Sequence, residues 1–259
     1  MAHQDDTLFA HPVQLVNSSG ASSIVLICEH AAYAIPAVLD HLGLPVHLRQ
    51  SHAAWDPGAM AVATRMSQRL DAILVAGTIS RLVYDCNRGP DAPDAMPIRS
   101  EIIDVPGNAD LSEVDKAQRI AQIYVPFHAT LADVVARTVS AIIITIHSFT
   151  PAYMGKARSV EIGILHDADA RLAEAMLAIA KDHTHAKVHR NEPYGPQDGV
   201  THTLKEHAIL GGHLNVMIEV RNDLITTKAA QIAMGDMIAG WVAAAFLCTS
   251  AQGIVQCSA

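Results

Sequence analysis

The stretch that decides the fold reads Ala141-Ile142-Ile143-Ile144-Thr145-Ile146-His147-Ser148-Phe149-Thr150-Pro151. A continuous run of β-branched residues is typical of a strand buried on both faces, as in a parallel sheet. The run ends at a histidine, a serine and then a proline, which predicts that His147 lies at the carboxyl end of the strand. In open α/β sheets this end faces the crevice in which ligands bind. His147 is therefore the first candidate for a functional residue.

A second apolar run, Ser23–Cys28, leads directly into Glu29 and His30. This pattern predicts another buried strand, which delivers a histidine to the same edge of the sheet. Two histidines fixed by buried strands would form a rigid frame for a metal ion, because ligands on regular elements are held more firmly than ligands on loops. The sequence therefore predicts that His30 and His147 belong to one metal site.

Strand and helix patterns alternate along the remainder of the chain. Helical spacing of apolar residues predicts helices at 57–70, 112–139 (bent near Pro126), 169–182 and 226–247, and further strands are expected at 72–76, 80–86 and 215–220. This alternation predicts a three-layer α/β/α fold with a mixed, mainly parallel central sheet. No repeat or linker divides the chain, so we expect residues 1–259 to form a single domain.

The composition excludes several classes of protein. Of the 259 residues, 50% are apolar and 17% are charged, which indicates a compact globule. The net charge of -8, without a basic face, argues against nucleic acid as a partner. Residues 1–6 lack the start of a secretory signal, the run 237–247 is too short to span a bilayer, and the four cysteines show no CxxC spacing. We expect a cytoplasmic protein that does not bind a membrane.

The third metal ligand is open between two acidic residues. Catalytic zinc sites take three protein ligands from His, Asp and Glu and leave a position for water. Asp56, in His52-Ala53-Ala54-Trp55-Asp56-Pro57-Gly58, is the first choice. As an alternative, Asp56 caps the following helix, since Asp before Pro-Gly suits that position. Glu29 is the second choice, although continued strand geometry would turn it away from His30.

A polar cluster lies in Arg81-Leu82-Val83-Tyr84-Asp85-Cys86-Asn87-Arg88. Alternation along the predicted strand places Arg81, Asp85 and Asn87 on one side. A guanidinium fork beside an amide suits a substrate carboxylate, so Arg81, Asn87 and Arg88 are candidate substrate-binding residues. The alternative for Arg81 is a structural ion pair with Asp85 that fixes the turn.

A glutamate interrupts the apolar strand Val216-Met217-Ile218-Glu219-Val220-Arg221. Burial without a partner is costly for a carboxylate and raises its pKa, which is how a general base or acid is tuned. Arg221, two residues later, would face the same side and hold Glu219 ionised, or the two would form a merely structural pair. Arg221 is also a candidate substrate-binding residue. Tyr194, in a turn-rich loop, is a further candidate for contact with a substrate.

Taken in order, these segments resemble the N-formylglutamate amidohydrolase family. The resemblance covers about residues 25–225 and rests on the segments 28–31, 52–59, 81–88, 147–151 and 219–223. That family is similar in fold to the zinc carboxypeptidases and aspartoacylase, with a mixed sheet between helices (a phosphorylase/hydrolase-like arrangement). The resemblance implies a zinc-dependent amidohydrolase that cleaves an N-acyl amino acid, first of all N-formyl-L-glutamate to formate and L-glutamate.

The resemblance also implies roles for individual residues. His30 and His147 would hold one zinc ion, or another divalent metal, and Glu219 would activate water. Asn87 and Arg88 would bind the substrate carboxylate, and Arg88 would in addition help to stabilise the developing oxyanion.

One departure from the carboxypeptidase pattern concerns the third ligand. Zinc carboxypeptidases take two ligands from His-x-x-Glu, but Tyr33 stands three positions after His30. Asp56 would then have to supply the third ligand. Two alternatives stay open at this point: a related zinc hydrolase of another N-acyl amino acid or a small peptide, and a non-catalytic module that binds a metal or a carboxylate.

Overall fold

The computed structural model describes residues 11–258, and its centre is a seven-stranded sheet in the order β1-β3-β2-β6-β11-β9-β10. The expectation that residues 1–6 carry no secretory signal lies outside the described residues. Neighbouring strands run parallel except for the pairs β1/β3 and β11/β9. The predicted mixed, mainly parallel sheet is confirmed. Its strands are β1 (Val13–Val16), β2 (Ile24–Cys28), β3 (Ile73–Gly77), β6 (Ile142–Phe149), β9 (Ile162–Leu165), β10 (Val188–Arg190) and β11 (Leu214–Arg221).

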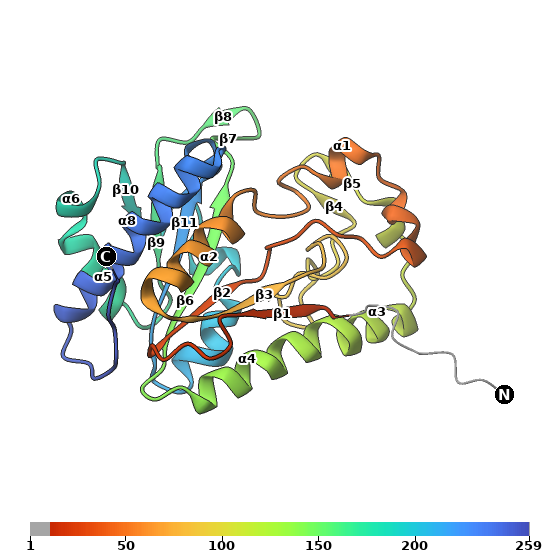
Figure 1. The fold of residues 1–259 in the computed structure, drawn as a ribbon. Coiled ribbons are helices and arrows are strands. Elements are labelled where there is room, and N and C mark those ends of the chain that lie inside the picture. The colour runs from red at the N-terminus through yellow and green to blue at the C-terminus, as the bar shows by residue number, and fades with distance from the viewer. Residues whose placement is uncertain (1–10, 259) are drawn as a thin grey trace.

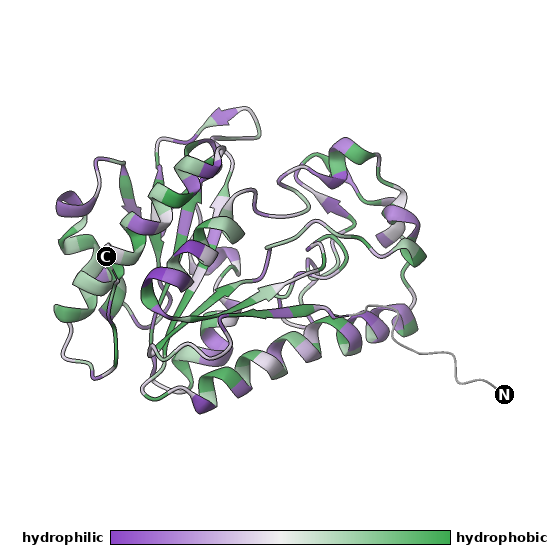
Figure 2. Cartoon of the chain, in the orientation of Figure 1, coloured by the Kyte–Doolittle hydropathy of each residue, from purple (hydrophilic) through white to green (hydrophobic). Residues whose placement is uncertain are grey.

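Helices cover both faces of this sheet (Figure 1). One face packs against α2 (Ala59–Leu70), α5 (Arg171–Ala178) and α8 (Lys228–Leu247), and the other against α4 (Val125–Arg137) and α7 (His202–Leu204). Every residue of β2, β3, β6 and β9 is buried, because neither face meets water. Figure 2 shows the hydrophobic residues gathered in these central strands. The predicted three-layer α/β/α architecture is confirmed.

Short elements connect these layers and surround the carboxyl edge of the parallel strands. Two small hairpins, β4–β5 and β7–β8, stand outside the central sheet. The remaining α-helices and strands of the described residues are α1 (Val46–Arg49), α3 (Glu113–Arg119), α6 (Ala180–His183), β4 (Arg99–Ser100), β5 (Ile103–Asp104), β7 (Ala152–Tyr153) and β8 (Lys156–Ala157).

The strand expected at 80–86 is wrong. This segment forms turns, in which the Ser80 carbonyl accepts a hydrogen bond from the amide of Val83 and the Ser80 hydroxyl accepts one from the amide of Leu82. Local bonds of this kind offer the backbone an alternative to a sheet ladder. The segment therefore folds over the edge of the sheet instead of extending it.

The long helix expected at 112–139 is divided into three parts. A capping box at Ser112 and Asp115 starts α3, a π-helical turn occupies Ile120–Tyr124, and α4 continues to Arg137. Pro126 lies in the first turn of α4. Proline has no amide hydrogen and its ring clashes with the carbonyl four residues earlier, so the wider turn before it relieves the clash.

The closing helix α8 lies within the predicted helix 226–247, and it is longer than the apolar run 237–247 that was too short to span a bilayer. With 20 residues it is long and apolar enough to cross a membrane by length and composition alone. It packs against α2 and α5. Its side chains enter the hydrophobic core between these helices and the sheet, where Ile238, Trp241 and Val242 are buried. A core helix of a soluble protein passes the same test of length and composition.

Candidate active site

The strand ends bring the predicted functional residues to one edge of the sheet. Glu29 and His30 follow β2, His147 lies in β6, and Glu219 lies in β11. Glu219 and His147 are direct partners in the parallel β6/β11 register, so their side chains project from the same face. The pairing of the two parallel strands therefore places Glu219, the candidate base, next to His147, a candidate metal ligand.

Asp56 is held inside this edge and does not cap the helix that follows it. The N-cap of α2 is Gly58, which has φ +86° and makes no side-chain capping bond. A side chain at this position would also collide with Ile225. The amide of Asp56 donates to the carbonyl of His30 at 3.0 Å, and its side chain is turned inward and buried. The capping alternative is therefore wrong.

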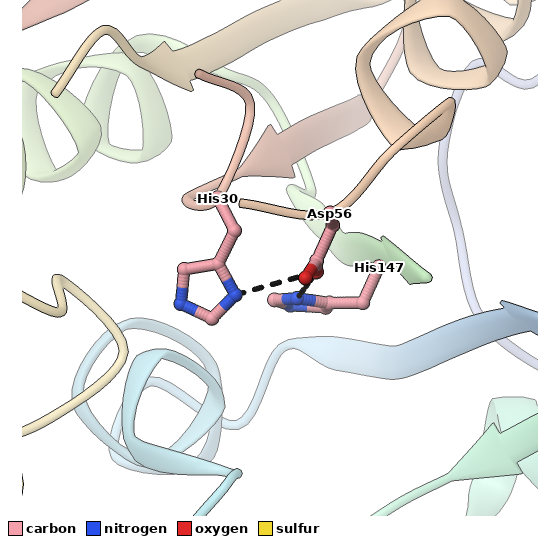
Figure 3. A group of neighbouring side chains, drawn as sticks. All are labelled: His30, Asp56 and His147. Carbon is pink, nitrogen blue, oxygen red and sulfur yellow. Dashed lines mark hydrogen bonds and ion pairs between the residues drawn. The ribbon is translucent and has the colours of Figure 1, made fainter. Parts of the chain in front are cut away.

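Three ligand atoms converge at this point (Figure 3). Oδ2 of Asp56 lies 3.3 Å from Nδ1 of His30 and 3.0 Å from Nδ1 of His147. All three side chains are buried, and one ligand atom from each lies within 4.8 Å of the other two. Two imidazole nitrogens and one carboxylate oxygen are a donor set that catalytic zinc accepts. The group could therefore hold a metal ion.

Two further carboxylates fix the outer nitrogens of the histidine rings. Oδ1 of Asp85 lies 2.7 Å from Nε2 of His30, and Oε2 of Glu29 lies 3.3 Å from Nε2 of His147. The second contact is an ion pair without a hydrogen bond. Carboxylates in such positions orient a ligating ring and select its tautomer. The structure thus places Glu29 behind His147 and Asp56 among the ligand atoms.

Arg81 contacts the candidate ligands directly. Its Nη1 donates to Oδ1 of Asp56 at 3.0 Å, and its other nitrogens donate to the carbonyls of His52 and Ala53. Burial alone would raise the pKa of Asp56, but Arg81 and His30 outweigh it and hold that pKa well below its usual range. The alternative of an ion pair between Arg81 and Asp85 is therefore wrong, because Arg81 pairs with Asp56.

Glu219 has the environment of a proton-transfer group. Burial raises its pKa to about 7; the nearby charge of His147 acts against this rise and that of Asp56 adds to it. Its Oε2 is buried without a hydrogen-bond partner among the described residues. Arg221 does not supply one, because its guanidinium pairs with Asp223 at 2.8 Å and Glu161 at 3.2 Å. The expected pairing of Glu219 with Arg221 is thus not formed.

A pocket of about 520 Å³ opens above these groups. It is lined by most of the residues that the sequence singled out, whereas Arg221 is outside the lining found among residues 11–258. The predicted residues in the lining are His30, Asp56, Arg81, Asn87, Arg88, His147, Tyr194 and Glu219.

Asn87 and Arg88 form one side of this pocket. The amide of Asn87 donates to the carbonyl of Val200 at 2.6 Å and its oxygen accepts from the amide of Thr203 at 3.0 Å. Arg88 donates through Nε to Asp94 at 2.6 Å and through Nη1 to the carbonyl of Gly199 at 2.8 Å. These bonds leave Nη2 of Arg88 without a partner in the described part of the chain. Asn87 therefore ties two loops together, and Arg88 keeps one donor edge for a ligand.

Sequence reasoning missed four residues of the site. Asp85 was considered only as a partner of Arg81, while His52, Tyr153 and Arg158 were given no role. Nδ1 of His52 lies 3.7 Å from Oδ1 of Asp56, and burial lowers the pKa of this histidine to about 3. The position of His52 four residues before Asp56 was the one signal in the sequence that pointed to it. Nothing in the local pattern around Arg158 distinguishes it from a surface arginine.

Comparison with known proteins agrees with this geometry. The sequence profile of the N-formylglutamate amidohydrolase family matches residues 22–226. The chain belongs to the N-formylglutamate amidohydrolase family. The matched range includes every residue of the site described above, and the predicted family resemblance is confirmed.

Two solved structures are similar to this family member. The gene product Atu2144 from Agrobacterium tumefaciens is 48% identical, with a TM-score of 0.89 and coverage of 92% of this chain and 95% of that one. N-formylglutamate amidohydrolase from Ralstonia eutropha JMP134 is 17% identical, with a TM-score of 0.54 and coverage of 89% and 98%. The second likeness shows a shared fold. Among curated proteins, none matches the chain.

Proposed function

We propose that this family member is a zinc-dependent amidohydrolase that converts N-formyl-L-glutamate into formate and L-glutamate. The observation that carries the proposal is the convergence of His30, Asp56 and His147 beside the buried carboxylate of Glu219. Membership of the family supports hydrolysis of an amide. The pocket above the group is large enough for a small N-acyl amino acid.

The donor set supports one zinc ion held by Nδ1 of His30, Nδ1 of His147 and Asp56. Asp85 and Glu29 would keep both rings in the orientation that presents Nδ1. A zinc ion there would polarise the acyl carbonyl and lower the pKa of water. Other divalent metals accept the same donors, so the metal present in the cell depends on supply as well as on the site.

Glu219 is the proposed general base. Its pKa of about 7, raised by burial, allows it to accept a proton from water near neutral pH and to return that proton to the departing amine. Its free Oε2 supports this role, since no other side chain competes for it in the described part of the chain.

Two arginines are proposed to bind the substrate and to stabilise the transition state. Arg88 binds the α-carboxylate through its free donor edge, and Asn87 holds the loop that carries it. Arg88 makes no contact with the three candidate ligands in residues 11–258, whereas Arg81 contacts two of them. We therefore assign stabilisation of the developing oxyanion to Arg81 in place of Arg88.

The test combines metal analysis with a substrate panel. Purified protein should contain zinc, release formate from N-formyl-L-glutamate, lose activity on chelation and regain it when zinc is added. N-acetyl-L-glutamate and a dipeptide, assayed in parallel, separate this activity from a related hydrolase. His30→Ala should lose metal and activity, and replacement of the exposed His185 by Ala is the matched control. Metal binding without hydrolysis of any of these substrates would overturn the proposal in favour of a non-catalytic module.

A further inference from the structure

Arg158 stands apart from the other arginines of the pocket. Arg81 pairs with Asp56, Arg88 with Asp94 and Arg99 with Asp104. Arg158 lines the same pocket but forms no ion pair within the described residues 11–258. A half-buried guanidinium without an acidic partner can form strong, charge-assisted hydrogen bonds with an anionic ligand.

The chain nevertheless holds Arg158 in a defined position. Its guanidinium carbon lies 4.8 Å from the ring centre of Tyr194, 4.9 Å from that of Tyr153 and 5.5 Å from that of Phe149. Cation–π contacts of this length orient a guanidinium without neutralising it. Nη1 also donates to the carbonyl of Thr150 at 3.1 Å. The side chain is thus preorganised, and its charge stays available.

Tyr194 adds a second donor at the same place. Its hydroxyl oxygen accepts a hydrogen bond from Nη2 of Arg158 at 2.8 Å, which leaves the hydroxyl hydrogen free to donate. Burial raises the pKa of Tyr194 to about 12, so the hydroxyl keeps that hydrogen at neutral pH. A guanidinium beside a phenolic hydroxyl is a pair of donors suited to one carboxylate.

Arg221 supports the backbone of this segment from outside the pocket. Its Nη1 lies 3.4 Å from the carbonyl oxygens of both Arg158 and Val160, and its Nη2 contacts Glu161 at 3.2 Å. The residue predicted to bind substrate therefore acts on the segment that carries Arg158. This makes Arg221 a positioning residue.

Arg158 and Arg88 line the same pocket but are anchored by different residues. Arg88 is held by Asp94 and Gly199, and Arg158 by Thr150 and Tyr194, so the two share no hydrogen-bond partner among residues 11–258. We propose that Arg158, with Tyr194, binds a second carboxylate of the substrate and makes the enzyme selective for N-acyl derivatives of acidic amino acids. This inference rests on the proposed function and names the residue that recognises the amino acid side chain.

The experiment compares matched pairs of ligands that differ only in the second carboxylate. With N-formyl-L-glutamate and its neutral isostere N-formyl-L-glutamine, Arg158→Gln should raise KM for the acidic substrate by about 10- to 100-fold, which is the loss expected for a charge-assisted hydrogen bond. The KM for the neutral substrate and both kcat values should change little. Arg158→Lys should restore part of the preference, and Arg171→Gln, at an exposed arginine paired with Asp169, is the matched control.

A binding measurement keeps this test independent of catalysis. Wild-type protein should bind glutarate more tightly than glutaramate by calorimetry, and Arg158→Gln should remove the difference. If no N-formyl substrate is hydrolysed but this difference exists, the proposed function fails while the role of Arg158 stands. Equal effects of Arg158→Gln on both members of a pair would show a structural role only and overturn the inference, as would a wild type without preference for glutarate.

Discussion

Oδ1 of Asp85 lies 2.7 Å from Nε2 of His30, on the side of the ring opposite to the nitrogen that faces Asp56. The same oxygen accepts a hydrogen bond from the amide of Asn87 at 2.8 Å. Asp85 therefore links the orientation of a candidate ligand to the loop that carries Arg88. This link makes Asp85 a target for separating metal affinity from substrate binding.

Replacing Asp85 with Asn should weaken zinc binding by about 10- to 100-fold, because a neutral amide supports a ligating imidazole less than a carboxylate does. The amide oxygen can still accept from Asn87, so the loop should stay in place. Zinc affinity measured by competition with a chelator checks this. The control is Asp169→Asn, at a half-buried carboxylate that pairs with Arg171 and does not line the pocket. Unchanged affinity in Asp85→Asn would contradict the supporting role.

Replacing Glu219 with Gln should leave the fold and the zinc content intact and lower kcat by at least about 100-fold, since the base is lost and the shape is kept. Formate release and metal analysis on the same preparation measure both quantities. Glu113→Gln, on the exposed surface of α3, serves as the control. Full activity of Glu219→Gln would remove Glu219 from the mechanism.

A pair of histidines outside the metal group should make the protein sensitive to acid. Nδ1 of His128 lies 2.7 Å from Nε2 of His207, and Nε2 of His128 contacts the carbonyl of Cys86 at 2.9 Å. Burial disfavours the charged ring and lowers the pKa of each histidine to about 4. In the unfolded chain the same histidines bind protons near their ordinary pKa of about 6.5. The contribution of the neutral, buried pair to the free energy of unfolding is therefore complete above about pH 6.5 and falls as the pH approaches 4.

His207→Gln should reduce this dependence, because glutamine can donate to His128 but does not titrate. When the pH is lowered from about 7 to 4, the free energy of unfolding should fall less in the variant than in the wild type, by on the order of 2 kcal/mol. Urea unfolding of the chelated protein at several pH values between about 4 and 7 measures it. The exposed His185→Gln should follow the wild type, and identical curves for His207→Gln and the wild type would disprove the assignment.

Gly163→Ala should destabilise the protein by about 1–3 kcal/mol, the usual cost of adding a methyl group to a packed site. Gly163 pairs with Glu219 across β9 and β11, and an added methyl would collide with the carbonyl of Glu192, close to the loop that carries Tyr194. The midpoint of urea unfolding, with its slope unchanged, measures the loss. Gly240→Ala in α8 meets open space and should be neutral or stabilising; a similar loss in both variants would argue against the collision.

The elements predicted best are the strands whose apolar sequence pattern matches their burial in the structure. Strands β2, β6 and β11 are largely apolar because both faces are covered, so their sequence alone indicated a parallel sheet. The segment 80–86 looked similar, but hydrogen bonds to Ser80 turned it into a loop. The amides of Ser80 and Arg81 also donate to the carbonyls of Ala34 and Ala54. These longer-range bonds depend on where distant segments of the chain lie, which periodicity does not report.

The sequence by itself determined the sheet and the two histidines at its edge, because a buried strand and its carboxyl end are local properties of the chain. Only the tertiary structure decided that Asp56 joins His30 and His147, which lie 26 and 91 residues away from it. It also decided that Asp85 and Glu29 face the outer nitrogens and that Arg158 has no acidic partner in the described residues. These outcomes depend on how loops pack against one another, and the side chains that meet there come from distant segments with no shared local pattern.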